Sequence, residues 1–165
     1  MDHDYFIEQV EEDLVLLLGS NLGERFLNLA DATARLTEVF GEPTQASKIY
    51  ETEPWGNKDQ PGFLNQALVF RSKFKPMISM EMILEIEIGL GRIREEKWGP
   101  RLIDIDIIFF GDMVYQSDLL EIPHPYMADR SFVLEPLAEI IPNFFHPLLN
   151  KKVSSLLIDL QQKNA

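Results

Sequence analysis

The chain has 165 residues, of which 45% are hydrophobic and 25% are charged, the composition of a single soluble globular domain. It carries 15 Lys and Arg against 27 Asp and Glu, a net charge of −12, which is opposite to the balance of generic nucleic-acid or anionic-membrane binders. The absence of cysteine excludes a disulfide scaffold, an iron–sulfur site and a cysteine nucleophile.

The N-terminal segment is acidic and lacks the basic-then-apolar order of a signal peptide. No apolar run reaches the roughly 20 residues of a membrane span. We therefore expect a cytoplasmic monomer without a nucleic-acid or membrane partner, with an acidic extension over residues 1–12 and one domain over 13–165.

The first part of the chain predicts three strands and one helix. Residues 13–18 form an almost wholly apolar run that ends at Gly19, typical of a buried strand. Residues 24–40 predict an amphipathic helix that ends before Gly41 and Pro43. Its expected apolar stripe is Phe26, Leu29, Ala30, Thr33, Leu36 and Phe40. Strands are expected over 46–52 and 63–72, separated by a loop rich in Pro and Gly.

Pro76 is expected to open a second helix with Met80, Ile83, Leu84 and Ile88 on its apolar side. Residues 102–110 predict a strand, which Gly111 and Asp112 turn back toward 113–115. The order β-α-β-β-α-β indicates an α+β, ferredoxin-like core with an antiparallel sheet. Helices expected near 130–140 and 153–161 would cover the second face, giving an α/β/α layered single domain.

Two acids in the last strand are the strongest chemical signal. Asp104 and Asp106 share one strand face, whereas Ile103, Ile105 and Ile107 take the other. Two carboxylates about 7 Å apart repel by roughly 2–2.5 kcal/mol at an effective dielectric constant near 20. Hard oxygen ligands without a nearby His or Cys suit Mg²⁺. The alternatives are a solvated strand face or an ion pair with Arg101.

Four basic residues precede these acids: Arg92, Arg94, Lys97 and Arg101. Guanidinium groups match phosphate oxygens and stay charged at any working pH. Together with the carboxylate pair, this stretch suggests a magnesium–polyphosphate clamp. Its alternative is a solvated loop whose charge is balanced by neighbouring glutamates.

Further candidates are aromatic or polar residues in unusual places. Phe63 and Asn65 point the same way from one strand, so that a flat heterocycle could stack on the ring while the amide reads its edge; Phe63 could equally be core. Trp55 and Trp98 lie in loops. Glu87 falls on the apolar stripe of its helix and needs partners. His124 lies in a proline-rich loop where it could meet a phosphate or be structural.

These residues occur together, in one order, in a known family. The segments are 19–23 (GSNLG), 50–54 (YETEP), 59–65 (DQPGFLN), 90–94 (LGRIR), 98–106 (WGPRLIDID), 123–125 (PHP) and 130–134 (RSFVL). The set resembles the 6-hydroxymethyl-7,8-dihydropterin pyrophosphokinases of folate biosynthesis over residues 14–147. That resemblance implies transfer of pyrophosphate from ATP to the hydroxymethyl oxygen of the pterin, with release of AMP.

The resemblance also implies roles for individual residues. Asp104 and Asp106 would be ligands of two Mg²⁺ ions and, with Arg92 and Arg94, catalytic. The pterin site would comprise Thr52, Pro54, Trp55, Phe63, Asn65, Trp98 and Phe132. The ATP site would comprise Glu87, Arg94, Trp98, Arg101, Ile107, His124 and Arg130.

The same residues also fit two other functions. One is a magnesium-dependent phosphoryl or nucleotidyl transferase with another acceptor. The other is a ferredoxin-like RNA-binding or regulatory domain that uses Phe63 as a stacking platform; the net charge of −12 argues against RNA.

Overall fold

The structure, a computed structural model, describes residues 11–53, 59, 62–91 and 102–165. Its centre is strand β1 (Glu12–Ser20), which lies between β4 (Phe63–Ser72) and β5 (Asp104–Phe110). Two short strands, β2 (Gln45–Ala46) and β3 (Tyr50–Thr52), pair with the other edge of β4, and all of these pairings are antiparallel. This strand order confirms the ferredoxin-like core.

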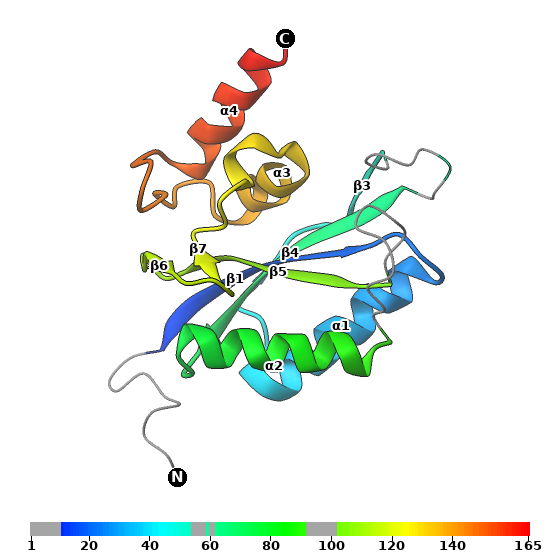
Figure 1. Cartoon of the computed structure of the whole chain (residues 1–165). Coiled ribbons are helices and arrows are strands. Elements are labelled where there is room, and N and C mark those ends of the chain that lie inside the picture. The colour runs from blue at the N-terminus through cyan, green and yellow to red at the C-terminus, as the bar shows by residue number, and fades with distance from the viewer. Residues whose placement is uncertain (1–10, 54–58, 60–61, 92–101) are drawn as a thin grey trace.

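Two helices cover one face of the sheet, α1 (Arg25–Phe40) and α2 (Pro76–Gly89), which lie side by side below it in Figure 1. The buried stripe of α1 consists of Leu29, Ala32, Leu36 and Phe40. Phe26 and Ile88, expected on buried faces, are instead 63% and 72% exposed. Both helices carry enough apolar residues to fit more than one helical phase, and packing against the sheet selects the phase.

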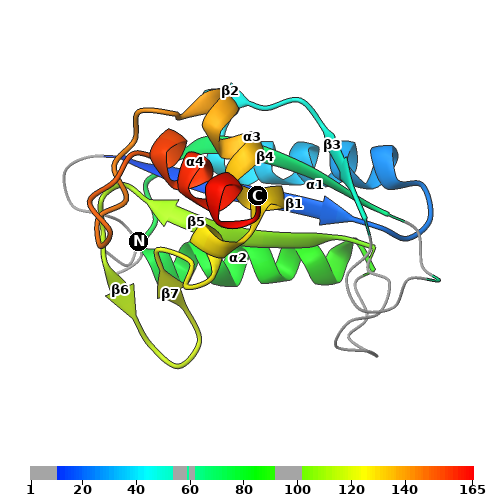
Figure 2. The same ribbon diagram turned by 90° about the horizontal axis from the view of Figure 1, so that it is seen from above.

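The second face is covered by α3 (Ser131–Ile140) and α4 (Val153–Lys163), preceded by a 3₁₀ turn, η2 (Met127–Asp129). Both α-helices were expected, and Figure 2 shows them lying over the sheet. They pack on a second apolar cluster that includes Val15, Leu17, Ala67, Val69 and Phe109. The strands therefore bury both faces, which explains why β1 is almost entirely apolar.

The continuous strand expected over residues 46–52 is interrupted. Between β2 and β3, the Ser47 backbone N–H donates to the Ala67 carbonyl, and the Ser47 hydroxyl accepts from the Ala67 N–H, each at 2.9 Å. A side-chain oxygen thus replaces a backbone acceptor, so the ladder breaks although its bonds are satisfied.

The hairpin after β5 also differs from expectation. Gly111 and Asp112 do turn the chain, but β6 (Tyr115–Gln116) pairs with β7 (Glu121–Ile122) in a separate two-stranded sheet rather than with β5. In Figure 2 this small sheet lies beside β5 and α2. The outer edge of β5 therefore lies next to this hairpin and, among the described residues, pairs with no further strand of the main sheet.

A β-bulge divides β5. Leu16 pairs with Ile107 whereas Val15 pairs with Phe109, so Ile108 is the extra residue. Ile107 belongs to the cluster below the sheet, whereas Ile108 and Phe109 both belong to the cluster under α3 and α4.

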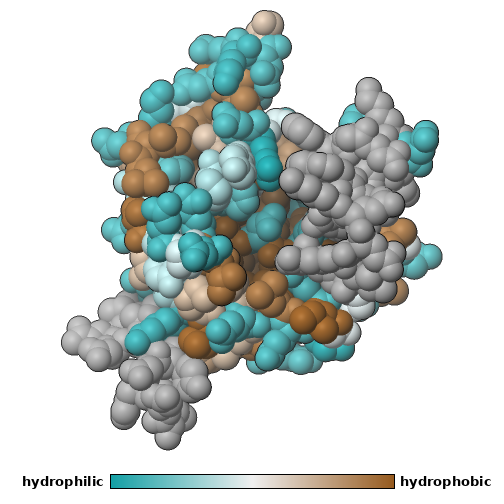
Figure 3. All heavy atoms as spheres, in the orientation of Figure 1, coloured by the Kyte–Doolittle hydropathy of each residue, from teal (hydrophilic) through white to brown (hydrophobic). Residues whose placement is uncertain are grey.

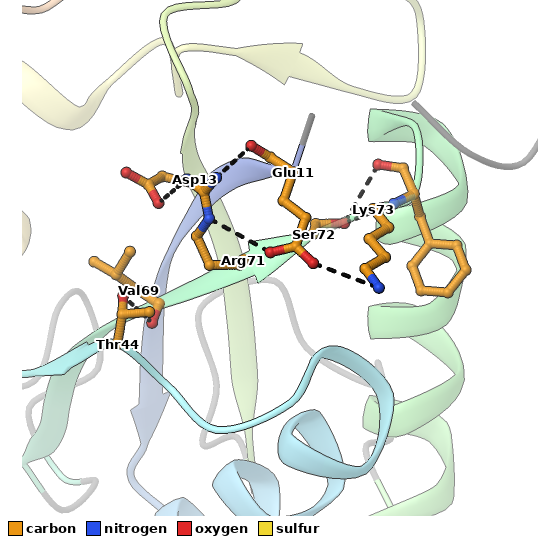
Figure 4. A network of polar contacts seen from close by, with 8 residues as sticks. Glu11, Asp13, Thr44, Val69, Arg71, Ser72 and Lys73 are labelled. Carbon is orange, nitrogen blue, oxygen red and sulfur yellow. Dashed lines mark hydrogen bonds and ion pairs between the residues drawn. The ribbon is translucent and has the colours of Figure 1, made fainter. Parts of the chain in front are cut away.

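Charged side chains join the start of β1 to the end of β4 (Figure 4). The Arg71 guanidinium contacts the Asp13 carboxylate at 2.8 Å and donates to the Glu11 carbonyl at 2.6 Å, and the Lys73 ammonium lies 3.5 Å from the Glu11 carboxylate. Such exposed ion pairs add little stability individually.

β1 begins at Glu12, so the sheet starts one residue before the domain boundary expected at residue 13. Among the described residues, none of the helices has the length and apolarity needed to cross a bilayer.

Candidate active site

A row of cross-strand neighbours forms the floor of the candidate site. Asp104 on β5 pairs with Gly19 on β1, Gly19 pairs with Asn65 on β4, and Asn65 pairs with Tyr50 on β3. Cross-strand partners share a sheet face. The next row, Asp106–Leu17–Ala67, places this face on the side of α3 and α4, because Leu17 and Ala67 belong to the cluster beneath those helices.

Asn65 and Phe63 point to the same side, as the sequence predicted. A Cβ atom built on Gly19 would lie 3.4 Å from Asn65 Oδ1 and 3.9 Å from Phe63 Cδ1. Asn65 is 3% exposed, and its Nδ2 donates to Thr52 Oγ1 at 3.0 Å. A glycine between the amide and the carboxylate of Asp104 leaves the floor of the site without a side chain at its centre.

Asp104 and Asp106 lie on the polar side of β5. Asp104 is half-buried and Asp106 exposed, whereas Ile103, Ile105 and Ile107 are buried in the other cluster, which confirms the predicted division of faces. Within the described part of the chain no three His, Cys, Asp or Glu side chains are grouped as a metal cage. Two carboxylates without His or Cys nevertheless fit Mg²⁺, which keeps waters and takes substrate phosphates as further ligands.

A cavity of about 350 Å³ adjoins this row at the outer edge of β5. Its lining comes from α2, β5, the β6–β7 hairpin and the segment that follows it: Met80, Ile83, Leu84, Glu87, Ile105, Asp106, Ile107, Ser117, Asp118, Leu119, Leu120, Glu121, His124 and Pro125. Figure 3 shows the molecule hollowed near the centre of this view, with apolar side chains at the base. Apolar walls with a few polar groups are typical of small-molecule sites.

Glu87 is 3% exposed, and its Oε2 accepts from the Ile105 backbone N–H at 2.8 Å. Because β5 is the last strand of the main sheet in the described part of the chain, this carboxylate takes the place of a ladder acceptor. The bond lies between Asp104 and Asp106 along the strand, so it fixes the backbone that carries both acids.

Replacing Glu87 by Leu removes that acceptor and leaves a buried N–H unpaired. We expect a loss of about 1–3 kcal/mol in the free energy of unfolding. Glu87→Gln keeps a side-chain oxygen and is expected to cost clearly less. Urea unfolding of both variants measures the difference, and equal losses would contradict the role of the Ile105 bond.

His124 is held as a neutral imidazole. Burial, and secondarily the positive charge of Arg130, lower the pKa of His124 to about 4. Its Nδ1 accepts from the Tyr126 backbone N–H at 3.2 Å, so the proton of the neutral ring is on Nε2. His124 also lines the cavity, where it can offer an uncharged donor to an oxygen ligand.

The lowered pKa of His124 predicts a pH-dependent stability. Its neutral form is favoured in the folded chain, so the stabilisation is complete above the unfolded pKa near 6.5 and is lost as the pH falls toward 4. Between pH 7.5 and pH 5 we expect a loss on the order of 1–2 kcal/mol from this group. Burial lowers the pKa of His146 as well, in the same direction. Urea unfolding should show a smaller fall in His124→Asn than in the unsubstituted chain, and identical falls would contradict the assignment.

Arg130 and Phe132 stand at the start of α3. The Arg130 guanidinium lies 5.3 Å from the centre of the Tyr126 ring and 5.7 Å from that of Phe132, within range of cation–π attraction. Phe132 is half-buried at the margin of the cluster under α3 and α4. The segment containing His124 is attached to β5, because the His124 N–H donates to the Ile108 carbonyl at 3.0 Å.

The structure thus brings together some of the expected residues. Thr52, Phe63, Asn65 and Asp104 belong to the sheet floor, and Glu87, Asp106, Ile107 and His124 line the adjoining cavity. Pro54, Trp55, Arg92, Arg94, Trp98 and Arg101 lie outside the described residues. The sequence gives no sign that Ser117–Glu121 belongs to a site, since a short hairpin carries no pattern that places it against α2.

The chain matches the sequence profile of the 7,8-dihydro-6-hydroxymethylpterin-pyrophosphokinase (HPPK) family over residues 15–142. It is 44% identical over 126 residues to a 2-amino-4-hydroxy-6-hydroxymethyldihydropteridine pyrophosphokinase of Bacillus subtilis, covering 76% of this chain and 75% of that protein. Identity to the Aquifex aeolicus protein of the same name is 40% over 134 residues, with coverage of 81% and 83%.

Longer proteins also match. The chain is 40% identical over 146 residues to the folic acid synthesis protein FOL1 of Dictyostelium discoideum, covering 88% of this chain and 22% of that protein. A crystal structure of Plasmodium falciparum HPPK-DHPS with pterin and p-hydroxybenzoate shares its fold, with a TM-score of 0.74 at 17% identity, over 96% of this chain and 46% of that one. The chain therefore spans about a fifth and about half of these two proteins.

The profile match and the identity to relatives of similar length agree with the motifs and the strand order: the chain belongs to the HPPK family, ATP-dependent diphosphotransferases that transfer pyrophosphate to hydroxymethyldihydropterin in folate biosynthesis.

Proposed function

We propose that this chain catalyses the family reaction at the sheet floor and the adjoining cavity. The pyrophosphoryl group of ATP is transferred to the hydroxymethyl oxygen of 6-hydroxymethyl-7,8-dihydropterin. A bond forms between that oxygen and the β-phosphorus, the bond from the β-phosphorus to the bridging oxygen of the α-phosphate breaks, and the hydroxyl proton is released. The products are AMP and the pterin diphosphate.

The observation that carries this proposal is the row Asp104–Gly19–Asn65 beside the 350 Å³ cavity. The row offers an amide that can both donate and accept hydrogen bonds, and a carboxylate on the same face one strand beyond the glycine. A heterocycle read by Asn65 would direct its substituent along the floor toward Asp104 and Asp106. The cavity, which Asp106 also lines, is then the place for the nucleotide.

Asp104 and Asp106 would hold two Mg²⁺ ions. When bound, these ions supply charge neutralisation on the triphosphate and polarise the transferred group. The contribution of the chain is to hold both carboxylates on one strand face, on a backbone fixed by the bond from Ile105 N–H to Glu87.

On the pterin side, we assign Thr52, Pro54, Trp55, Phe63, Asn65, Trp98 and Phe132. Asn65 is buried and already bonded to Thr52, so it reads the ring edge from a fixed position. Phe63 and Phe132 would stack on the ring.

On the nucleotide side, we assign Glu87, Arg94, Trp98, Arg101, Ile107, His124 and Arg130. A neutral His124 would donate from Nε2 to a phosphate oxygen without adding charge. Arg92 and Arg94, with Arg101 and Arg130, would offset the charge that grows on the departing AMP. We propose in addition that the chain acts in the cytoplasm, where ATP is available, as a monomer without a nucleic-acid partner.

Incubation of the chain with ATP, Mg²⁺ and the reduced pterin alcohol, followed by product mass measurement, tests the proposal. Formation of AMP and the pterin diphosphate, abolished by a chelator, is the expected result. Formation of ADP would instead indicate a kinase that transfers one phosphoryl group, and absence of either product would contradict the proposal.

A further inference from the structure

The carboxylate of Glu139, near the C-terminal end of α3, joins that helix to the segment between β2 and β3. Glu139 Oε1 accepts from the Tyr50 hydroxyl at 2.6 Å. The Lys48 backbone N–H donates to both oxygens, at 3.2 Å and 3.1 Å. In addition, Gln45 Nε2 donates to the Ile140 carbonyl at 2.9 Å. One turn of α3 is therefore bonded to three residues of a single short segment.

That segment leads directly into the strand that contacts Asn65. Tyr50 is the cross-strand partner of Asn65, and Thr52, two residues later, is the partner of Phe63. Asn65 Nδ2 donates to Thr52 Oγ1. Because β3 has only three residues and lies at the edge of the sheet, its place depends on contacts beyond its ladder with β4.

α3 carries another proposed wall of the same site. Phe132 precedes Glu139 by seven residues, which in an α-helix places both on nearly the same side, about 10 Å apart along the axis. α3 contacts both β3 and β4. The bonds at Glu139 therefore act together with the packing of the buried face of α3 in holding the rotation of the helix about its axis, and with it the direction in which Phe132 projects.

The Tyr50 hydroxyl stays protonated over the working pH range. The hydrogen bond to Glu139, followed by burial and by the charges of Glu139 and Glu135, raises the pKa of Tyr50 to about 12. The phenol is therefore a donor at any pH at which the enzyme is assayed. Glu139 itself is exposed, so the contact adds little to global stability; its effect should fall on local geometry.

We propose that Glu139 and Tyr50 are positioning residues that set the spacing between the two walls of the pterin site, Thr52 and Phe63 on the sheet and Phe132 on α3. This inference rests on the proposed function, because it takes that site to bind the pterin. Neither residue touches the reacting atoms; they act through the placement of β3 and α3.

The test compares Tyr50→Phe, Glu139→Ala and the double variant. Tyr50→Phe keeps the ring and removes only the hydroxyl. We expect the KM for the pterin to rise about five- to tenfold in each single variant, with kcat and the KM for ATP within twofold and the melting temperature nearly unchanged. The double variant should be no worse than Glu139→Ala, because both substitutions break the contact between the Tyr50 hydroxyl and the Glu139 carboxylate.

Asp159→Ala, which removes the exposed contact of Asp159 with Lys151, is the matched control and should leave all these constants unchanged. Titration of pterin into each variant in the presence of a non-hydrolysable ATP analogue gives the same comparison without turnover. An unchanged pterin KM and affinity in an active chain would overturn the positioning role alone. No product from the unsubstituted chain would instead overturn the proposed function.

Discussion

Replacing Asp104 or Asp106 by alanine is expected to lower kcat by at least about 10²–10³-fold while leaving the chain folded. Each substitution removes one of the two carboxylates that share the open face of β5. Neither acid is buried, so its loss opens no cavity. The rate of AMP release, measured beside the melting temperature, separates the effect on catalysis from one on folding.

Asp31→Ala is a suitable control for these variants, because Asp31 is exposed on α1, which covers the opposite face of the sheet. This substitution removes the same charge as the other two. It should keep both the rate and the melting temperature. Wild-type-like rates in both Asp104→Ala and Asp106→Ala would refute the role of the pair as magnesium ligands.

The largest effect on stability is expected from Phe109→Ala. Phe109 is fully buried; its ring lies 4.7 Å from that of Phe144 and 5.6 Å from that of His146, measured between ring centres. Removal of this side chain should lower the free energy of unfolding by about 3–5 kcal/mol. For a domain of this size, that corresponds to a fall of roughly 10 °C in melting temperature. The cavity would form between β5 and the α3–α4 layer.

Phe145→Ala provides the comparison for that measurement. Phe145 lies in the connection between α3 and α4, as Phe144 and His146 do, but it is 52% exposed. Its replacement by alanine should lower the free energy of unfolding by less than about 1 kcal/mol. Thermal or urea unfolding of the two variants decides the matter. Similar losses in both would mean that Phe109 does not hold the layer to the sheet.

Local sequence patterns predicted the helices and strands that are determined by residues close together in the chain. The strand over residues 63–72 and the helix that starts at Pro76 were placed correctly because the loop rich in Pro and Gly before the strand and the proline at the start of the helix mark them directly. The break between β2 and β3 was missed because it depends on the hydroxyl of Ser47 reaching a strand twenty residues away.

The same division holds at the candidate site. The faces of Asp104 and Asp106 follow from the period of a strand and were predictable. Three other features join residues far apart in the chain. They are the bond between Glu87 and Ile105, the position of the Ser117–Glu121 hairpin beside α2, and the contact between Tyr50 and Glu139. No single-sequence pattern encodes such pairs, since they depend on the path that the backbone takes.

The extra residue in β5 lets the two ends of the strand assign their side chains to the two layers independently. On the N-terminal side of Ile108, odd-numbered positions face α1 and α2; beyond it, even-numbered positions do. The sheet face taken by Asp104 and Asp106 therefore does not dictate the faces taken by Phe109 and Phe110. One strand can in this way hold two carboxylates outside the apolar clusters at one end and close a hydrocarbon interior at the other, through a single irregularity in its pleat.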